Sequence, residues 1–357
     1  MDDQGHDTAD SAEVSGTRSF LPAVEGMRAC AAMGVVLTHV AFQTANSSGW
    51  YGRLFTRFDL AVAVFFALSG FLLWRGHAAA ARGLRHRPPT GHYLRSRIVR
   101  IMPGYLVAVV VILALLPDAH ADLTVWLANL TLTQVYVPLT LTAGLTQMWS
   151  LAVEVSFYLV LPLLALLARR LPVDWRVPAI AALAVASFAW PALPWHLPFG
   201  VNQMNWLPAL FSWFAAGMLL AELTVMPVGR MHQLARRRWV MAAIAGVAFV
   251  IAATPLAGNI GLAPGTVGQV VVKTAMGAVV AGALLAPLVL DAPGTPHRIL
   301  GSTTMVTLGR WSYGLFIWHL AALAMVFPVI GEFPFNGHMP IVLILTWVFG
   351  FAIAAVS

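Results

Sequence analysis

The sequence predicts an all-α, polytopic membrane protein with about ten transmembrane helices and a cytoplasmic N-terminus. Hydrophobic residues make up 59% of the 357 residues and charged residues only 10%, whereas soluble domains carry about 25% charged residues. The mean hydropathy is +0.79. Arginines also gather in alternate connections between the hydrophobic stretches, which is typical of a multi-pass protein with a fixed orientation.

The hydrophobic stretches follow one another along the chain, and each is long enough, or nearly so, to cross a bilayer core of about 30 Å. They are 21–44, 58–76, 96–117, 146–168, 177–194, 205–226, 239–256, 268–290, 311–330 and 339–356. The first residues, MDDQGHDTADSAEVSGTRSF, are polar and acidic and lack the apolar core of a signal peptide. We therefore expect residues 1–20 to form a disordered cytoplasmic tail and residues 21–357 to form a single transmembrane domain.

The positions of the arginines set the expected orientation. If the N-terminus is inside, the connections on the cytoplasmic side hold Arg75, Arg82, Arg85, Arg87, Arg95, Arg97, Arg100, Arg169, Arg170, Arg176, Arg230, Arg236, Arg237, Arg238, Arg298 and Arg310. The opposite side holds Arg53 and Arg57. This asymmetry predicts a multi-pass protein of the inner (plasma) membrane, and it explains the net charge of +7 without a nucleic-acid partner. The Ala- and Arg-rich, Lys-poor composition suggests a bacterial source.

The largest cytoplasmic connection is RGHAAAARGLRHRPPTGHYLRSRIVRIMPGY, in which seven arginines precede Pro103. Proline suits the start of a helix, so the next helix is expected to begin near this residue. Arg97 and Arg100 are three residues apart and should project to nearly the same side of the helix start. Two guanidinium groups near a helix N-terminus can bind a phosphate or diphosphate. A topological signal that also contacts anionic membrane lipids is the alternative.

Polar residues inside the apolar stretches are functional candidates, because burying them in a membrane is costly. They are Arg28 and His39 in the first stretch, Glu154 in the fourth, Glu222 in the sixth, Lys273 in the eighth and His319 in the ninth. Glu222 and Lys273 lie near the ends of their stretches, where their side chains could extend to the membrane surface, so we expect structural roles for both.

Arg28 and His39 are separated by about three helical turns, so they share one face of the first helix roughly 16 Å apart along its axis. His39 and Glu154 both fall in the outer halves of their helices and could meet at a similar depth. A neutral imidazole held by a carboxylate is a plausible general base. A buried pair that only joins two helices fits the sequence equally well.

Several segments together resemble the acyltransferase-3 family of integral membrane O-acyltransferases. They are FLPAVEGMRACAAMGVVLTH, in which ten residues separate Arg28 from His39, VFFALSGFLL (64–73), RSRIVRIMPGYLVA (95–108), MWSLAVEVSFYLVLPLL (148–164) and LGRWSYGLFIWHL (308–320). The resemblance spans nearly the whole chain, and the segments occur in the family's order.

The resemblance implies transfer of an acyl group, commonly acetyl, from cytoplasmic acyl-CoA to a hydroxyl of a cell-envelope glycan, glycolipid or macrolide-like molecule. No metal is expected. The resemblance also assigns roles to individual residues. His39 is the expected base with Glu154 as its helper, and Arg28, Arg97 and Arg100 are the expected CoA contacts. Candidates for the wall of the substrate cavity are Ser69, Trp149, Ser150, Tyr313 and His319, for which packing or aromatic-belt roles fit the sequence equally well.

Two further alternatives stay open at the level of the sequence. Transfer can be direct, or it can pass through a covalent acyl-His39 or acyl-Ser69 intermediate, although Ser69 and Gly70 also suit close helix packing. A proton-coupled transporter would also place His, Glu and Arg near the membrane midplane. The lack of an internal repeat and the arginines clustered at one helix entry favour the transferase.

Overall fold

The computed structural model describes residues 21–87, 89–116, 119–258, 265–292 and 294–356, and this part of the chain is helical without a β-strand. The α-helices are α1 Pro22–Gln43, α2 Gly49–Thr56, α3 Ala61–Ala81, α4 Thr90–Leu115, α5 Leu123–Leu130, α6 Trp149–Ala168, α7 Val173–Ser187, α8 Leu207–Leu223, α9 Arg230–Ala235, α10 Arg238–Ala253, α11 Val267–Val289, α12 Thr303–Ile330 and α13 Met339–Val356. The all-α prediction is confirmed. The predicted tail, residues 1–20, lies outside the described residues.

Every predicted stretch contains a helix, but not all of these helices are equally suited to a membrane. Within the described residues, eight helical segments are long and apolar enough to cross a bilayer. The two predicted spans outside this group are α1, whose apolar character is diluted by Glu25, Arg28 and His39, and α10. α10 has 16 residues, which corresponds to about 24 Å of helix and is shorter than the bilayer core.

The start of α4 differs from the prediction. We expected the helix to begin near Pro103, but α4 begins at Thr90 and Pro103 lies inside it. Pro89 immediately precedes α4 and has an extended backbone conformation, so the helix does not continue further toward the N-terminus. The basic residues that follow Pro89 do not interrupt the helix. Arg97 and Arg100 therefore lie in the body of α4 rather than at its N-terminus. Their guanidinium groups, and not the free N–H groups of a helix start, must make any contact with an anion.

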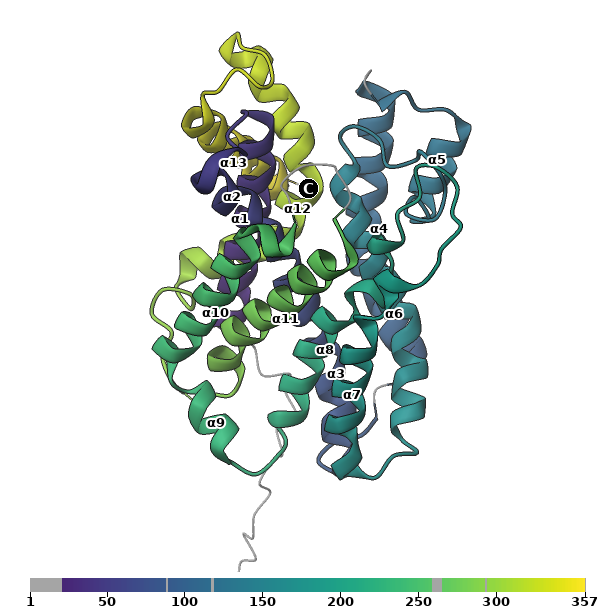
Figure 1. The fold of residues 1–357 in the computed structure, drawn as a ribbon, viewed down its shortest axis with the longest axis vertical. Coiled ribbons are helices and arrows are strands. Elements are labelled where there is room, and N and C mark those ends of the chain that lie inside the picture. Colours follow the sequence, from purple (N-terminus) through teal and green to yellow (C-terminus); the bar gives the residue numbers. More distant parts are fainter. Residues whose placement is uncertain (1–20, 88, 117–118, 259–264, 293, 357) are drawn as a thin grey trace, which may run out of the picture.

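The helices pack around a central pair, α3 and α8 (Figure 1). On one side α1 packs against α12 and α13, so the first and last helices of the described chain are neighbours (Figure 1). α11 joins the central pair to α10, and α7 covers another side of α8. The connections from α3 to α4 and from α6 to α7 lie at the same end of the molecule as α9, at the bottom of Figure 1.

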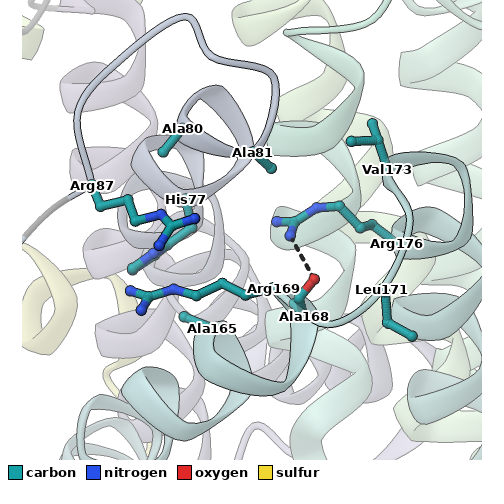
Figure 2. Close-up of a pocket in the computed structure, with 10 residues that line it drawn as sticks. All are labelled: His77, Ala80, Ala81, Arg87, Ala165, Ala168, Arg169, Leu171, Val173 and Arg176. Carbon is teal, nitrogen blue, oxygen red and sulfur yellow. Dashed lines mark hydrogen bonds between the residues drawn. The ribbon is translucent and has the colours of Figure 1, made fainter.

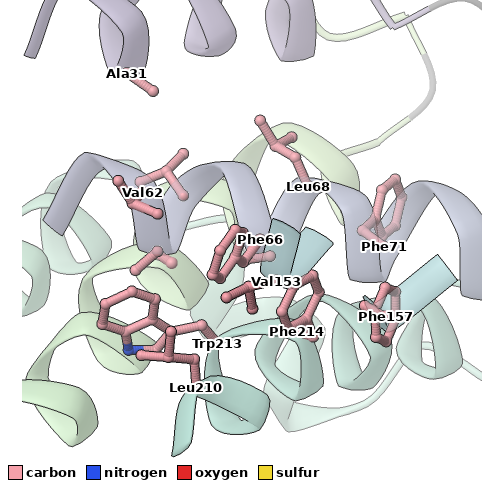
Figure 3. Packing of buried hydrophobic residues seen from close by; sticks show 14 of the residues in the cluster. Ala31, Val62, Phe66, Leu68, Phe71, Val153, Phe157, Leu210, Trp213 and Phe214 are labelled. Atoms are coloured by element: carbon pink, nitrogen blue, oxygen red, sulfur yellow. The ribbon is translucent and has the colours of Figure 1, made fainter. Parts of the chain in front are cut away.

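The core at the central crossing combines stacked aromatic rings with glycines. Phe66 of α3 stacks on Phe214 of α8 with ring centroids 4.4 Å apart, and Phe157 of α6 stacks on the same ring at 4.2 Å (Figure 3). A Cβ atom at Gly217 would lie 1.8 Å from the backbone oxygen of Ala67, and one at Gly70 would lie 2.1 Å from that of Phe214. The predicted packing role of Gly70 is thus confirmed, since only glycine allows this approach.

Candidate functional site

A polar cavity lies between α1, α3, α6 and α12. It is lined by Arg28, Val62, Phe65, Phe66, Ser69, Ser150, Leu151, Glu154, Ser312, Tyr313 and Phe316. Five of the residues that the sequence suggested, Arg28, Ser69, Ser150, Glu154 and Tyr313, therefore meet at one place. The cavity joins a cation on α1 to a carboxylate on α6 and to hydroxyl groups from three helices.

Glu154 accepts hydrogen bonds from two hydroxyl groups. Tyr158, one turn further along α6, donates to Oε1 at 2.6 Å, and Ser69 of α3 donates to the same oxygen. A carboxylate that accepts the proton of a serine hydroxyl is the arrangement that activates a nucleophile. Tyr158 is not among the predicted site residues, although its spacing of four residues from Glu154 on a helix is a usable signal.

The partner of His39 is a second histidine rather than the expected Glu154. His39 Nδ1 lies 3.4 Å from Nε2 of His319, and the ring centroids are 5.0 Å apart. No hydrogen bond joins His39 to Glu154 within the described chain. α1 packs on α3 and α12, whereas α6 packs on α3, α4 and α8, so a shared depth in the membrane did not make the two helices neighbours.

Backbone carbonyl groups define which ring nitrogens carry protons. His39 Nδ1 is 2.9 Å from the oxygen of Val35, and His319 Nδ1 is 2.7 Å from the oxygen of Phe316. A carbonyl oxygen only accepts, so in the neutral rings both Nδ1 atoms carry hydrogen and both Nε2 atoms carry the lone pair. The single Nδ1–H of His39 is then shared between the oxygen of Val35 and the more distant Nε2 of His319, and Nε2 of His39 is left as the basic atom.

The His39–His319 pair lies next to the cavity, at the end that is distant from Arg28. Phe316 and Phe65 line the cavity and their ring centroids are 6.1 Å apart. The ring of Phe316 is in turn 5.8 Å from that of His319, which is fully buried. Arg28 and His39 thus flank the two ends of the cavity, as their spacing on α1 predicts.

Three arginines gather at the other end. Arg28 Nη1 lies 3.7 Å from Oε1 of Glu25, a loose ion pair. Arg100 interacts electrostatically with both Arg28 and Arg97, and Arg97 interacts with Tyr158. Glu25 and Glu154 are the carboxylates near them, so the three guanidinium groups keep an excess of positive charge, which favours an anionic ligand.

Tyr313 and Trp149 have structural contacts of their own. Tyr313 lines the cavity and donates from its hydroxyl to the oxygen of Ile101 at 2.6 Å, which ties α12 to α4. Trp149, which was expected to line the cavity, packs edge-on against Phe66 with ring centroids 6.4 Å apart. Ser312 is a cavity residue that the sequence analysis missed.

Glu222 has the structural role that the sequence favours, but it does not extend to the membrane surface. Its side chain is fully buried and accepts hydrogen bonds from Trp74 at 2.8 Å, Arg82 at 2.6 Å and Arg176 at 2.9 Å. Lys273 is partly exposed and forms an ion pair with Asp59. Both charges are paired within the helix bundle, because neighbouring helices bring partners that the sequence of one helix cannot reveal.

Comparison with known proteins agrees with the sequence resemblance. The family model described as an acyltransferase domain, of the acyltransferase-3 type, matches residues 21–357. The chain is also 29% identical over 320 residues to a protein of Streptomyces mycarofaciens named acyltransferase MdmB. The aligned region covers 85% of this chain and 79% of that protein. No solved structure matches the chain.

Proposed function

Because the chain belongs to the acyltransferase-3 family, we propose that it moves an acyl group, acetyl in the first instance, from cytoplasmic acyl-CoA to a hydroxyl of an acceptor at the inner membrane. The acceptor classes that fit are a cell-envelope glycan or glycolipid and a hydrophobic, macrolide-like molecule. The observation that carries the proposal is the cavity lined by Arg28, with Arg97 and Arg100 near that end and the His39–His319 pair adjoining the other.

In this proposal the arginines bind the acyl-CoA donor. Guanidinium groups of Arg28, Arg97 and Arg100 would hold the phosphates of CoA, for which their planar donors are well suited. The pantetheine arm would then extend along the cavity toward the histidines. Arg28 and His39 are separated by roughly 16 Å of helix, a distance suited to a ligand with a charged head and a long arm.

His39 would act as the general base. Its Nε2 atom takes the proton from the acceptor hydroxyl while the oxygen attacks the thioester carbon. The tetrahedral intermediate collapses, the carbon–sulfur bond breaks, and the imidazolium returns the proton to the leaving thiolate of CoA. His319 Nε2 and the Val35 carbonyl both face the Nδ1 atom of His39, so they orient the ring and stabilise its positive charge.

The hydrogen bond from Ser69 to Glu154 supports a second route, through an acyl-Ser69 intermediate. In that route Glu154 accepts the serine proton as Oγ attacks the thioester carbon, the carbon–sulfur bond breaks, and CoA leaves as the thiol with that proton. The acceptor oxygen then attacks the acyl-serine ester, takes the acyl group and gives its own proton, through Glu154, back to Ser69. Mass spectrometry of protein quenched after mixing with labelled acetyl-CoA separates the routes. Label on Ser69 or on His39 supports a covalent route, and unlabelled protein during turnover supports direct transfer.

The test of the function is the reaction itself. Purified protein is incubated with labelled acetyl-CoA and a panel of envelope lipids, glycolipids and macrolide-like acceptors, and the products are identified by mass spectrometry. His39→Ala should lower the turnover number by about 10²–10⁴-fold, the range expected for a positioned acid–base group. His196→Ala, which removes an exposed imidazole in the connection between α7 and α8, is the matched control and should stay within about twofold of wild type.

A His39→Ala variant that keeps more than about a tenth of the wild-type turnover number would place the base elsewhere. If acetyl-CoA is never consumed and a solute crosses sealed vesicles instead, the transporter alternative replaces the transferase.

A further inference from the structure

A second, strongly basic pocket lies beyond the cavity, where the connection from α3 to α4 meets the connection from α6 to α7 (Figure 2). Among the ten residues that line it, Arg87, Arg169, Arg176 and His77 are basic and none is acidic. Figure 2 shows the guanidinium groups of Arg87 and Arg169 on the His77 side of the pocket, with Arg176 facing them. His77 interacts electrostatically with both Arg169 and Arg176.

The charge of this pocket is only partly neutralised within the described chain, because Glu222 pairs with Arg176 alone among its arginines. Arg176 is only 3% exposed, and it is fixed by its hydrogen bonds to Glu222 and to the oxygen of Ala168 at 3.1 Å. Glu222 already serves Arg82 and Trp74 as well. The guanidinium groups of Arg87 and Arg169 make no ion pair or hydrogen bond to a described residue. A pocket that combines one anchored and two available guanidinium groups is built for an anion.

The pocket is separate from the three arginines of the catalytic cavity but aligned with them. Ser69 lines the cavity and His77 lines the basic pocket, and their spacing of eight positions along α3 corresponds to about 12 Å. Glu154 and Ala165 are related in the same way on α6, with about 16 Å of helix between them. The two sites therefore follow one another along the same two helices.

We propose that this pocket, formed by Arg87, Arg169, Arg176 and His77, is a second binding site for a phosphate group, at the end of the molecule opposite the histidine pair. Two sources carry this chemistry, the nucleotide end of CoA and the headgroup of an anionic phospholipid. The first source rests on the proposed acyl-CoA donor, whereas the phosphate site itself does not. Charge-assisted, forked contacts from arginine to phosphate oxygens are the interaction on which binding depends.

Pyrophosphate is the first probe, because it offers phosphate oxygens to the arginines but has neither a nucleotide nor a lipid tail. The variant is Arg87→Gln/Arg169→Gln, which changes two exposed side chains and leaves the Arg176–Glu222 pair intact. The control is Arg170→Gln/Arg230→Gln, which removes the same charge from exposed positions of neighbouring segments that do not line the pocket. All proteins are measured in uncharged detergent at low salt, and equal melting temperatures without ligand show that they are folded.

We expect pyrophosphate to raise the melting temperature of the wild type and the control, and to bind the pocket variant more weakly by about tenfold or more. Two further measurements identify the source. A CoA affinity that falls in the pocket variant but not in the control assigns the nucleotide end, and loss of co-purifying phosphatidylglycerol in native mass spectra assigns the lipid. Pyrophosphate that has no effect on the wild type, or that binds the pocket variant and the control equally, overturns the site.

The outcome is distinguishable from failure of the proposed function. If no CoA binds to the wild type but pyrophosphate binding depends on Arg87 and Arg169, the donor assignment fails and the phosphate site stands. If CoA binding depends on Arg97 and Arg100 alone and pyrophosphate binds the pocket variant as tightly as the control, the donor assignment stands and the second site fails.

Discussion

At the scale of single residues, backbone carbonyls determine what the side chains of the cavity can do. The oxygen of Val35 fixes the proton of His39 on Nδ1, and the oxygen of Phe316 does the same for His319. Each of these carbonyls lies one turn or less before its histidine on the same helix. Local helix geometry thus selects the tautomer that leaves Nε2 of His39 basic.

The arginines of α4 allow a prediction at this scale. The double variant Arg97→Gln/Arg100→Gln should raise KM for acyl-CoA by about tenfold or more, because charge-assisted contacts to phosphate are lost, with a smaller effect on kcat. The variant should also lose much of the dependence of KM on added salt, since screening acts on the removed charges. Steady-state kinetics with acetyl-CoA at several salt concentrations measures both effects.

Arg95→Gln is the matched control, because Arg95 is an exposed arginine on the same helix. Its KM should stay within about twofold of wild type. An unchanged KM in the double variant would reduce Arg97 and Arg100 to signals of membrane topology.

At the scale of helices, the position of the cavity depends on close crossings made by glycine. Gly70 and Gly217 let α3 and α8 touch through their backbones, and Gly309 brings α12 against the backbone of Glu25 in α1. Ser69 directly precedes Gly70, and Arg28 lies one turn after Glu25 on α1. The two crossings therefore bring both side chains to the walls of the same cavity. Helix packing in membranes relies on such small residues, because lipid supplies little hydrophobic drive between helices.

Substitution of one glycine tests this dependence. Gly217→Ala adds a single Cβ atom 1.8 Å from the oxygen of Ala67, so α3 and α8 must move apart. We expect a loss of about 1–3 kcal/mol of stability, as for other overpacked cores. The measurement is the free energy of unfolding in mixed detergent and denaturant.

Gly246→Ala in α10 is the matched control, since a Cβ atom there has no neighbour within 4 Å. It should be neutral or more stable by up to about 1 kcal/mol, because alanine is the better helix former. Equal effects of the two substitutions would contradict the role of the α3–α8 crossing.

At the scale of the whole molecule, the sites are arranged in order along the predicted membrane normal. The basic pocket of Arg87 and Arg169 is formed by the α3–α4 and α6–α7 connections, which lie together at one end of the molecule (Figure 1). The arginines of the cavity come next and the histidine pair follows. With the orientation that the arginine asymmetry predicts, this sequence runs from the cytoplasm outward.

This order predicts that donor and acceptor reach the cavity from opposite sides. In sealed vesicles of known orientation, acetyl-CoA supplied on the cytoplasmic side should be consumed, and free CoA should appear on that side. Acetylated acceptor should be recovered from the other leaflet or compartment, and acetyl-CoA supplied outside should be inert. Acceptor confined to the cytoplasmic side that is acetylated equally well would contradict the two-sided arrangement while leaving the reaction intact.

The sequence by itself determined the helical class, the approximate positions of the apolar helices and the shared face of Arg28 and His39. These features are local, since length, apolar content and the helical repeat depend on neighbouring residues along the chain. The same locality explains the errors. The local proline signal predicts a helix start near Pro103, yet α4 already begins at Thr90.

Only the tertiary structure decided which polar groups are partners. His39 lies beside His319, 280 residues away, and Glu154 beside Ser69, 85 residues away, while Glu222 is enclosed by arginines from two other segments. A helix fixes the depth and the face of a side chain but not the helix that it faces. That choice depends on the crossings at Gly70, Gly217 and Gly309, where the backbones of helices distant in the sequence come into contact.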